Sequence, residues 1–142
     1  MARWASLVEE RRRERPVLVI DAGDFSVPPE SPFREVRNRY FLSAMKLLRY
    51  DAVGIGGRET AAGLDGVLAS ARSYGIPLVN SNILIRGRKR PAAPISIVKE
   101  LGGAKTLFGR KGAVRIGIFS VALPGFIYRA GPDVPKAYYV AD

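Results

Sequence analysis

The chain has 142 residues, of which 47% are hydrophobic and 25% are charged, a balance typical of one globular domain with a hydrophobic core. It contains no cysteine and no histidine, which excludes disulfides, thiolate metal sites, Ser-His-Asp triads and HExxH zinc sites. No apolar run approaches the roughly 20 residues that cross a bilayer. The net charge of +10 leaves two interpretations open: a polyanionic partner, or an arginine-rich composition without such a partner. The charges are scattered along the chain, which favours the second interpretation.

Helices and strands are predicted to alternate through the first half of the chain. The expected order is a helix over 3–15, a strand over 17–20, a helix from 31 to about 49, a strand over 51–55, a helix over 61–74 and a strand over 77–79. The first strand is continuously apolar, so we expect it to be buried on both faces. Ser31 and Pro32 are expected to start the second helix as its cap and first residue, with Phe33 and Tyr40 on its buried face.

The second half of the chain has a different character. A basic loop over 86–91 precedes two predicted strands, over 94–101 and 113–121, and a further short strand is expected near 106–108. We interpret this half as a β-meander. The alternation before it favours an α/β fold with crossover helices.

Polar residues follow the three predicted strands of the first half. They are Asp21 and Asp24, then Gly56 to Glu59, then Asn80 to Asn82. Ligands bind beyond the carboxyl ends of the strands in open α/β sheets, and carboxylate and amide oxygens suit a hard cation such as Mg²⁺ or Mn²⁺. Each group also has a structural interpretation that stays open: Asp24 as the cap of a turn, the glycines as a tight turn, and the asparagines as turn residues.

Five ordered stretches of the sequence carry a resemblance to a known family. They are ARWASLVEERRRERPVLVIDAGDF, LRYDAVGIGGRE, GIPLVNSNI, KGAVRIGIFSVA and YYVAD. Their order and spacing resemble the 5′-nucleotidase branch of the calcineurin-like metallophosphoesterases, in which the corresponding segments end in GD, GNHE and ANI motifs. The resemblance covers nearly the whole chain and implies a partial α/β sandwich of the metallophosphoesterase type.

The resemblance also implies a chemistry. In the family, two divalent ions (Mn, Mg, Zn or Fe) clamp a phosphate ester and supply the hydroxide that attacks phosphorus. The aspartate of the GD motif is a metal ligand, and Asp24 occupies its position. Gly57 and Arg58 occupy the positions of the asparagine and histidine of GNHE, so one metal ligand and the proton donor are lost.

Two residues are weaker candidates for the site. Arg58 can bind a phosphate oxygen pair through its guanidinium, although pairing with Glu59 or with solvent is an open alternative. Asn82 is a second candidate metal ligand. The site expected from the sequence is therefore Asp24 and Asn82 for metal and Arg58 for phosphate.

The family pattern extends beyond both ends of the chain. Its D-x-H motif lies upstream and its G-H and G-H-x-H motifs lie downstream, so we expect residues 1–142 to form an incomplete domain cut at both ends, with the remaining segments absent from this chain. Family members usually act outside the cytoplasm, which implies a periplasmic or exported parent protein, although the chain carries no signal of its own.

Three functions are carried forward from the sequence. The first is metal-dependent hydrolysis of nucleotides or related phosphate monoesters in the complete protein. The second is a catalytically silent relative that binds phosphorylated ligands. The third, ranked lowest, is nucleic-acid binding by Arg86 to Arg90 with Arg34, Arg37 and Arg39, because the aromatic residues lie at helical core spacing and form no stacking platform.

Overall fold

A computed structural model describes residues 2–28, 30–107, 109–125 and 134–141. Its helices are α1 (Ala2–Glu14), α2 (Arg34–Leu47), α3 (Gly57–Ala61), α4 (Leu64–Tyr74) and α6 (Val134–Ala137). Its strands are β1 (Ile20–Asp21), β2 (Ala52–Val53), β3 (Ile83–Ile85), β4 (Arg90–Pro91), β5 (Ile97–Leu101), β6 (Ala104–Thr106), β7 (Gly109–Lys111), β8 (Val114–Ile118) and β9 (Tyr138–Val140). No helix in these described ranges is long and apolar enough to cross a membrane.

Parallel strands joined by helices form the centre of the molecule. β1 pairs in parallel with β2, with Ile20 opposite Ala52. Val53 then forms a parallel bridge with Leu78, where its N–H donates to Pro77 O at 2.9 Å. The predicted alternation of strands and helices is therefore confirmed, although the third strand is reduced to the bridge at Leu78.

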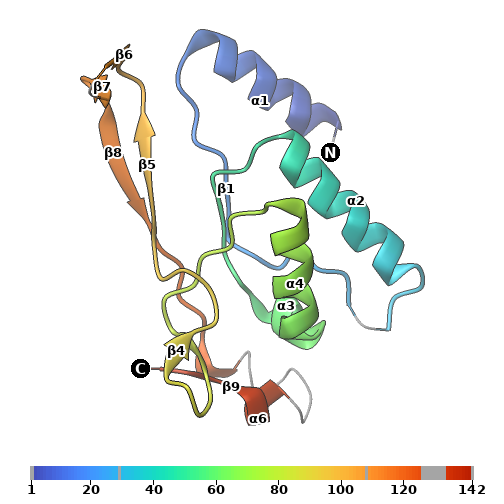
Figure 1. Ribbon diagram of the computed structural model, residues 1–142. Helices are drawn as coiled ribbons and strands as arrows, with labels where there is room; N and C mark the ends of the chain where they lie inside the picture. The colour runs from blue at the N-terminus through green and yellow to red at the C-terminus, as the bar shows by residue number, and fades with distance from the viewer. Residues whose placement is uncertain (1, 29, 108, 126–133, 142) are drawn as a thin grey trace.

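The core lies between this parallel sheet and the helices that follow its strands. In Figure 1, α2 and α4 lie on one side of β1 and the β5–β8 ribbon lies on the other. The largest buried hydrophobic cluster joins α2, β2 and α4, and its members in these elements are Leu42, Met45, Val53, Leu64, Leu68 and Ala71. Burying each large aliphatic side chain contributes about 1.5–3 kcal/mol, so this cluster holds the crossover helices against the strand ends.

The predicted start of the second helix is wrong. Ser31 lies in a turn, where its N–H donates to Pro28 O at 3.0 Å, and α2 begins only after Phe33, which has a left-handed φ of 59°. The buried face predicted for this helix is also wrong at its N-terminal half. Phe33 and Tyr40 are 78% and 74% exposed, whereas Leu42 is 4% exposed and belongs to the core.

Two further predictions in the first half need correction. Ile20 is 55% exposed, so the first strand is not buried on both faces. The helix expected over 61–74 is divided, because Gly63 has a φ of +95° that ends one helical segment and precedes the next. The first segment, α3, begins at Gly57 and takes in residues that the sequence placed in a turn.

The second half of the chain is antiparallel. The strands expected over 94–101 and 113–121 are β5 and β8, which pair directly with each other, and β6 and β7 extend this ribbon. A separate sheet has the order β4-β3-β9. Its strands escaped sequence analysis because β3 and β9 are three residues long and pair across more than 50 residues of chain.

Tyr138 connects this last sheet to α4. Its side chain is 4% exposed, and its hydroxyl donates a hydrogen bond to Asp65 Oδ1. Burial and the bond to Asp65 raise the pKa of Tyr138 to about 12 from its ordinary value of 10.0. A phenol with a raised folded-state pKa stabilises the fold fully below pH 10, and this contribution is lost as pH rises towards 12.

We predict that Tyr138→Phe lowers the free energy of unfolding by about 1 kcal/mol at pH 8, because one buried hydrogen bond is lost. Between pH 10 and 12 the difference from the natural chain should shrink, since the natural chain alone loses the tyrosine contribution. Urea unfolding across this pH range measures the difference. Tyr40→Phe, at a 74% exposed side chain, is the matched control, and a Tyr138→Phe difference that stays constant to pH 12 would contradict the prediction.

Candidate phosphate site

The buried carboxylate of Glu59 joins the two loops that follow β1 and β2. Its side chain is 0% exposed. Glu59 Oε2 accepts hydrogen bonds from Asp24 N at 2.7 Å and Gly56 N at 2.8 Å, and Oε1 accepts one from Ser26 N at 2.8 Å. Three backbone donors therefore compensate the cost of burying this charge.

Glycines allow the two loops to lie in direct contact. A Cβ atom on Gly56 would lie 2.5 Å from Asp24 Oδ1, and one on Gly23 would lie 2.7 Å from Gly56 N. Gly23 also has a φ of +107°, which favours glycine. The glycines of the DAGD and GIGG segments are thus required by the close approach of the loops.

Asp24 lies at the exposed edge of the contact between the loops that follow β1 and β2, which is called the joint below. Its Oδ1 accepts a hydrogen bond from Arg58 N at 2.8 Å, in the first turn of α3, so Asp24 caps that helix, whereas the sequence offered it as the cap of a turn. Its second carboxylate oxygen has no hydrogen-bond partner within the described residues. Asp24 therefore holds the helix end with one oxygen and presents the other to solvent.

The Arg58 side chain is exposed and lines the same hollow as Asp24. This hollow has a volume of about 320 Å³ and is also lined by Arg37 and Phe41. None of the ion pairs found among the described residues involves Arg58, and the oxygens of Glu59 already accept backbone N–H groups. Asp24 and Arg58, which the sequence proposed for one site, are therefore neighbours on one surface.

The side chains of the two asparagines after Leu78 form hydrogen bonds with the backbone. Asn80 is 0% exposed, and its Oδ1 accepts hydrogen bonds from Asn82 N and Ile83 N, the pattern of a turn residue. Asn82 Oδ1 accepts from Ala122 N at 2.8 Å, and its Nδ2 donates to Ala122 O at 3.0 Å. The assignment of Asn82 as a metal ligand stays a prediction. The side-chain oxygen that would bind the metal already accepts a hydrogen bond from the backbone.

The residues at this edge do not suffice for a two-metal centre. Within the described ranges, no group of three or more His, Cys, Asp or Glu side chains is placed to hold a metal ion. Asp21 Oδ1 accepts a hydrogen bond from Gly23 N at 2.9 Å, and Gly57 has no side-chain donor atom. Among these groups Asp24 is the exposed carboxylate, and its oxygens are too few to hold two metal ions for hydrolysis.

The role of Glu59 was missed by sequence analysis, which weighed it as one of the polar residues at a strand end and as a partner for Arg58. The available signal was its position three residues after Gly56, because a glutamate at this spacing accepts the N–H of the helix cap residue. Its bonds to Asp24 and Ser26 connect residues 35 and 33 positions apart, which no local pattern reveals.

We predict that Glu59→Gln lowers the free energy of unfolding by about 3 kcal/mol, because the buried amide cannot accept all three backbone bonds and directs N–H groups at one of them. Urea unfolding followed by circular dichroism measures the loss. Glu10→Gln, at an exposed position of α1, should stay within about 0.5 kcal/mol of the natural chain. A loss below about 1 kcal/mol at Glu59 would show that the three bonds contribute little.

No family model and no curated protein sequence matches this chain. Its structure is similar to that of the calcineurin-like phosphoesterase YfkN from Bacillus subtilis, with a TM-score of 0.79 and 22% identity over 100% of this chain and 46% of that one. It is also similar to a 5′-nucleotidase precursor from Thermus thermophilus, with a TM-score of 0.66 and 21% identity over 97% of this chain and 25% of that one.

The NAD nucleotidase NadN from Haemophilus influenzae gives a TM-score of 0.70 with 16% identity over 97% of this chain and 26% of that one. The chain thus spans less than half the length of each of these proteins. At identities of 16–22%, the likeness is one of fold. The chain has a metallophosphoesterase fold of the kind found in 5′-nucleotidase structures.

Proposed function

We propose that this chain forms part of a phosphoesterase domain that binds nucleotides or related phosphate monoesters at the edge occupied by Asp24 and Arg58. The observation that carries the proposal is the 2.8 Å hydrogen bond from Arg58 N to Asp24 Oδ1. This bond joins the segments that resemble the GD and GNHE motifs, and the proposal is supported by the hollow that both residues line.

Charge and hydrogen bonding support a phosphate ligand at this position. The guanidinium of Arg58 presents N–H donors in the fork geometry that matches two phosphate oxygens. Arg37 lines the same hollow and has a bond to Ser31 Oγ at 3.5 Å, so it can contribute a second cation. Phe41 offers an apolar surface for the organic part of the ester.

The role proposed for Asp24 is to hold a divalent ion with its open oxygen, as the resemblance implies. A bound divalent ion would supply charge that offsets the phosphate. One carboxylate gives few ligands, so we expect weak metal binding by this chain and assign hydrolysis to the complete protein. The structures that the chain resembles are described as phosphoesterases and nucleotidases, which supports the choice of substrate class.

A catalytically silent relative is the second candidate. It is favoured by the lack of a three-ligand cluster among the described residues and by Gly57 and Arg58 in the GNHE-like position. Both candidates predict binding of a phosphate monoester, and turnover of the complete protein distinguishes them. Release of inorganic phosphate with Mn²⁺ supports the enzyme, whereas binding without release supports the silent relative.

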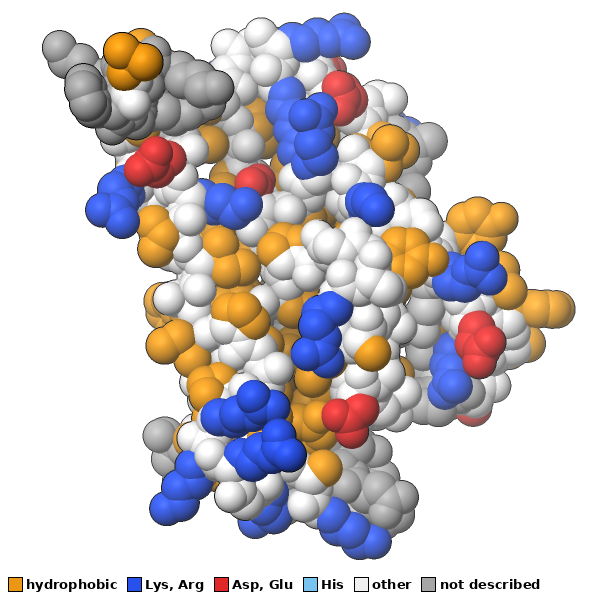
Figure 2. Space-filling model, viewed as in Figure 1, with side chains coloured by type: hydrophobic (Ala, Val, Ile, Leu, Met, Phe, Trp, Pro, Cys, Tyr) orange, Lys and Arg blue, Asp and Glu red, His pale blue; other side chains and the backbone are white. Residues whose placement is uncertain are grey.

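Nucleic-acid binding remains the lowest-ranked candidate. Figure 2 shows Lys and Arg side chains gathered at the end of the molecule that carries β4, β9 and α6. The exposed residues Arg88 and Lys89 lie there, in the turn between β3 and β4. The arginines of α2 lie on a different element, so the structure does not join the two groups that the sequence hypothesis combined.

We predict that AMP binds the 142-residue chain and that Arg58→Gln weakens this binding about tenfold, because one charge-assisted contact to phosphate is lost. Asp24→Asn should remove any strengthening of AMP binding by Mn²⁺ and should strengthen metal-free binding severalfold, because a like charge beside the phosphate is removed. Isothermal titration calorimetry with and without Mn²⁺ measures both effects. Arg88→Gln, which removes one positive charge from the distant turn, is the matched control.

Equal loss of affinity in Arg58→Gln and Arg88→Gln would contradict a specific phosphate contact, since it would indicate general attraction to a basic protein. Binding that weakens steeply with salt and is stronger for single-stranded DNA than for AMP would favour the nucleic-acid candidate instead.

A further inference from the structure

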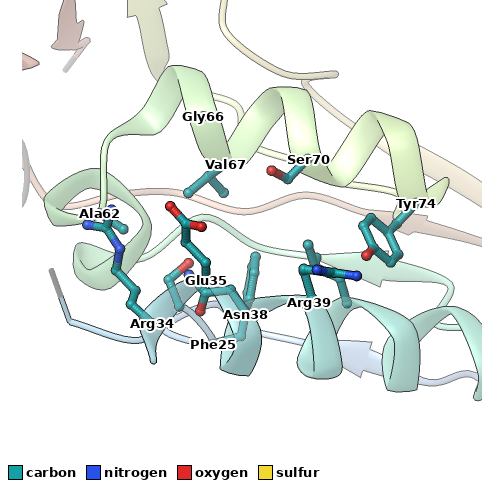
Figure 3. A pocket seen from close by; sticks show the side chains of 12 residues that line it. Phe25, Arg34, Glu35, Asn38, Arg39, Ala62, Gly66, Val67, Ser70 and Tyr74 are labelled. Atoms are coloured by element: carbon teal, nitrogen blue, oxygen red, sulfur yellow. The ribbon is translucent and has the colours of Figure 1, made fainter. Parts of the chain in front are cut away.

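A second hollow lies between α2 and α4, and Figure 3 shows the side chains that surround it. Its volume is about 350 Å³, within the range of small-molecule sites. The residues that line it are Phe25, Ser26, Arg34, Glu35, Asn38, Arg39, Leu42, Ala62, Gly66, Val67, Ser70 and Tyr74. Neither Asp24 nor Arg58 is among them, so this hollow is distinct from the candidate phosphate site, although the two share part of their lining.

The face that α2 turns towards this hollow is unusually polar. A helix that packs on a core ordinarily directs its apolar residues inwards. In α2, Arg34 and Asn38 are half-buried in the lining, whereas Tyr40 and Leu47 are 74% and 77% exposed. The hollow is therefore lined by polar side chains of α2, of which Arg34 and Asn38 are half-buried and Glu35 and Arg39 are exposed.

Most of these polar groups are hydrogen-bond donors. Across the described part of the chain, neither Arg34 nor Arg39 forms an ion pair or a side-chain hydrogen bond. Asn38 accepts the bond from Val27 N with its Oδ1 at 2.8 Å, which leaves its amide N–H groups to donate. Glu35 is the one carboxylate of the lining, so the lining carries one net positive charge and favours an oxyanion.

Gly66 keeps one wall of the hollow open. It lies inside α4, where glycine weakens a helix relative to alanine. A Cβ atom at this position would meet nothing within 4 Å, so neighbouring side chains do not require a glycine. The remaining walls include the apolar side chains of Phe25, Leu42 and Val67 and the ring of Tyr74, which suit a planar hydrophobic group.

We propose that the hollow between α2 and α4 is a binding site for a small aromatic organic anion. The anionic group lies against the guanidinium groups of α2, and the aromatic body lies over Gly66 and against the apolar walls. Arg39 and Tyr74 lie side by side at one end of the hollow in Figure 3, where a carboxylate can bind the guanidinium while the ring contacts tyrosine.

This hollow shares part of its lining with the candidate phosphate site. Phe25 and Ser26 line both hollows, and Ser26 N donates to the buried carboxylate of Glu59. A ligand between the helices therefore contacts the loop that carries Asp24. The binding proposal itself does not depend on phosphoesterase function.

The test uses the ¹⁵N-labelled 142-residue chain with 2-naphthoate as the probe and the neutral 2-naphthamide as its matched control. We expect saturable binding of naphthoate, with amide shift changes concentrated in α2 and α4, and affinity for naphthamide weaker by about tenfold. Arg39→Gln should weaken naphthoate binding about tenfold, and Glu35→Gln should strengthen it severalfold by removing a like charge. Arg88→Gln, outside the hollow, should leave it unchanged.

Gly66→Leu provides the decisive variant, because leucine fills the open wall and also favours a helix. It should keep the fold, as measured by its amide spectrum and urea unfolding, and abolish binding. Naphthoate that binds Gly66→Leu as tightly as the natural chain would overturn the proposal. Equal affinity for naphthoate and naphthamide, or no saturable binding to the natural chain, would overturn it as well.

Discussion

The buried carboxylate of Glu59 is the constraint on which the candidate phosphate site depends. It accepts three backbone N–H groups from two loops that follow neighbouring parallel strands. An unpaired charge at a 0% exposed position would be strongly destabilising, so the carboxylate and its donors are stable only together. The glycines at positions 23 and 56 allow this arrangement because a side chain at either would collide with the opposite loop.

The contact between the two loops determines where Asp24 and the start of α3 lie. Asp24 can cap α3 through Arg58 N only because Glu59 holds Asp24 N on the other side. Asp24 and Arg58 then line one hollow, which they share with Arg37. Side chains of both charge signs thus line one hollow, whereas the described residues supply too few carboxylates for two metal ions.

Sequence patterns predicted the parts of this fold that depend on neighbours along the chain. The alternation of helices and strands, the ligand-rich strand ends and the resemblance of the DAGD and GGRE segments could all be read locally. The start of α2 could not, because Phe33 takes a left-handed turn that a serine-proline pair does not signal. The role of Glu59 and the strands β3 and β9 also escaped, because their partners lie more than 30 residues away.

Hydrogen exchange at single amides tests the central claim most directly. If Glu59 locks the joint, the N–H groups of Asp24, Ser26 and Gly56 should exchange only through global unfolding, with protection equal to that of core amides such as Val53. The amide of the exposed residue Arg88, whose N–H donates a 3.3 Å bond to Ile85 O within the β3–β4 turn, should exchange much faster. Fast exchange at all three joint amides while Val53 stays protected would show that the loops open independently of the core, and would contradict the account.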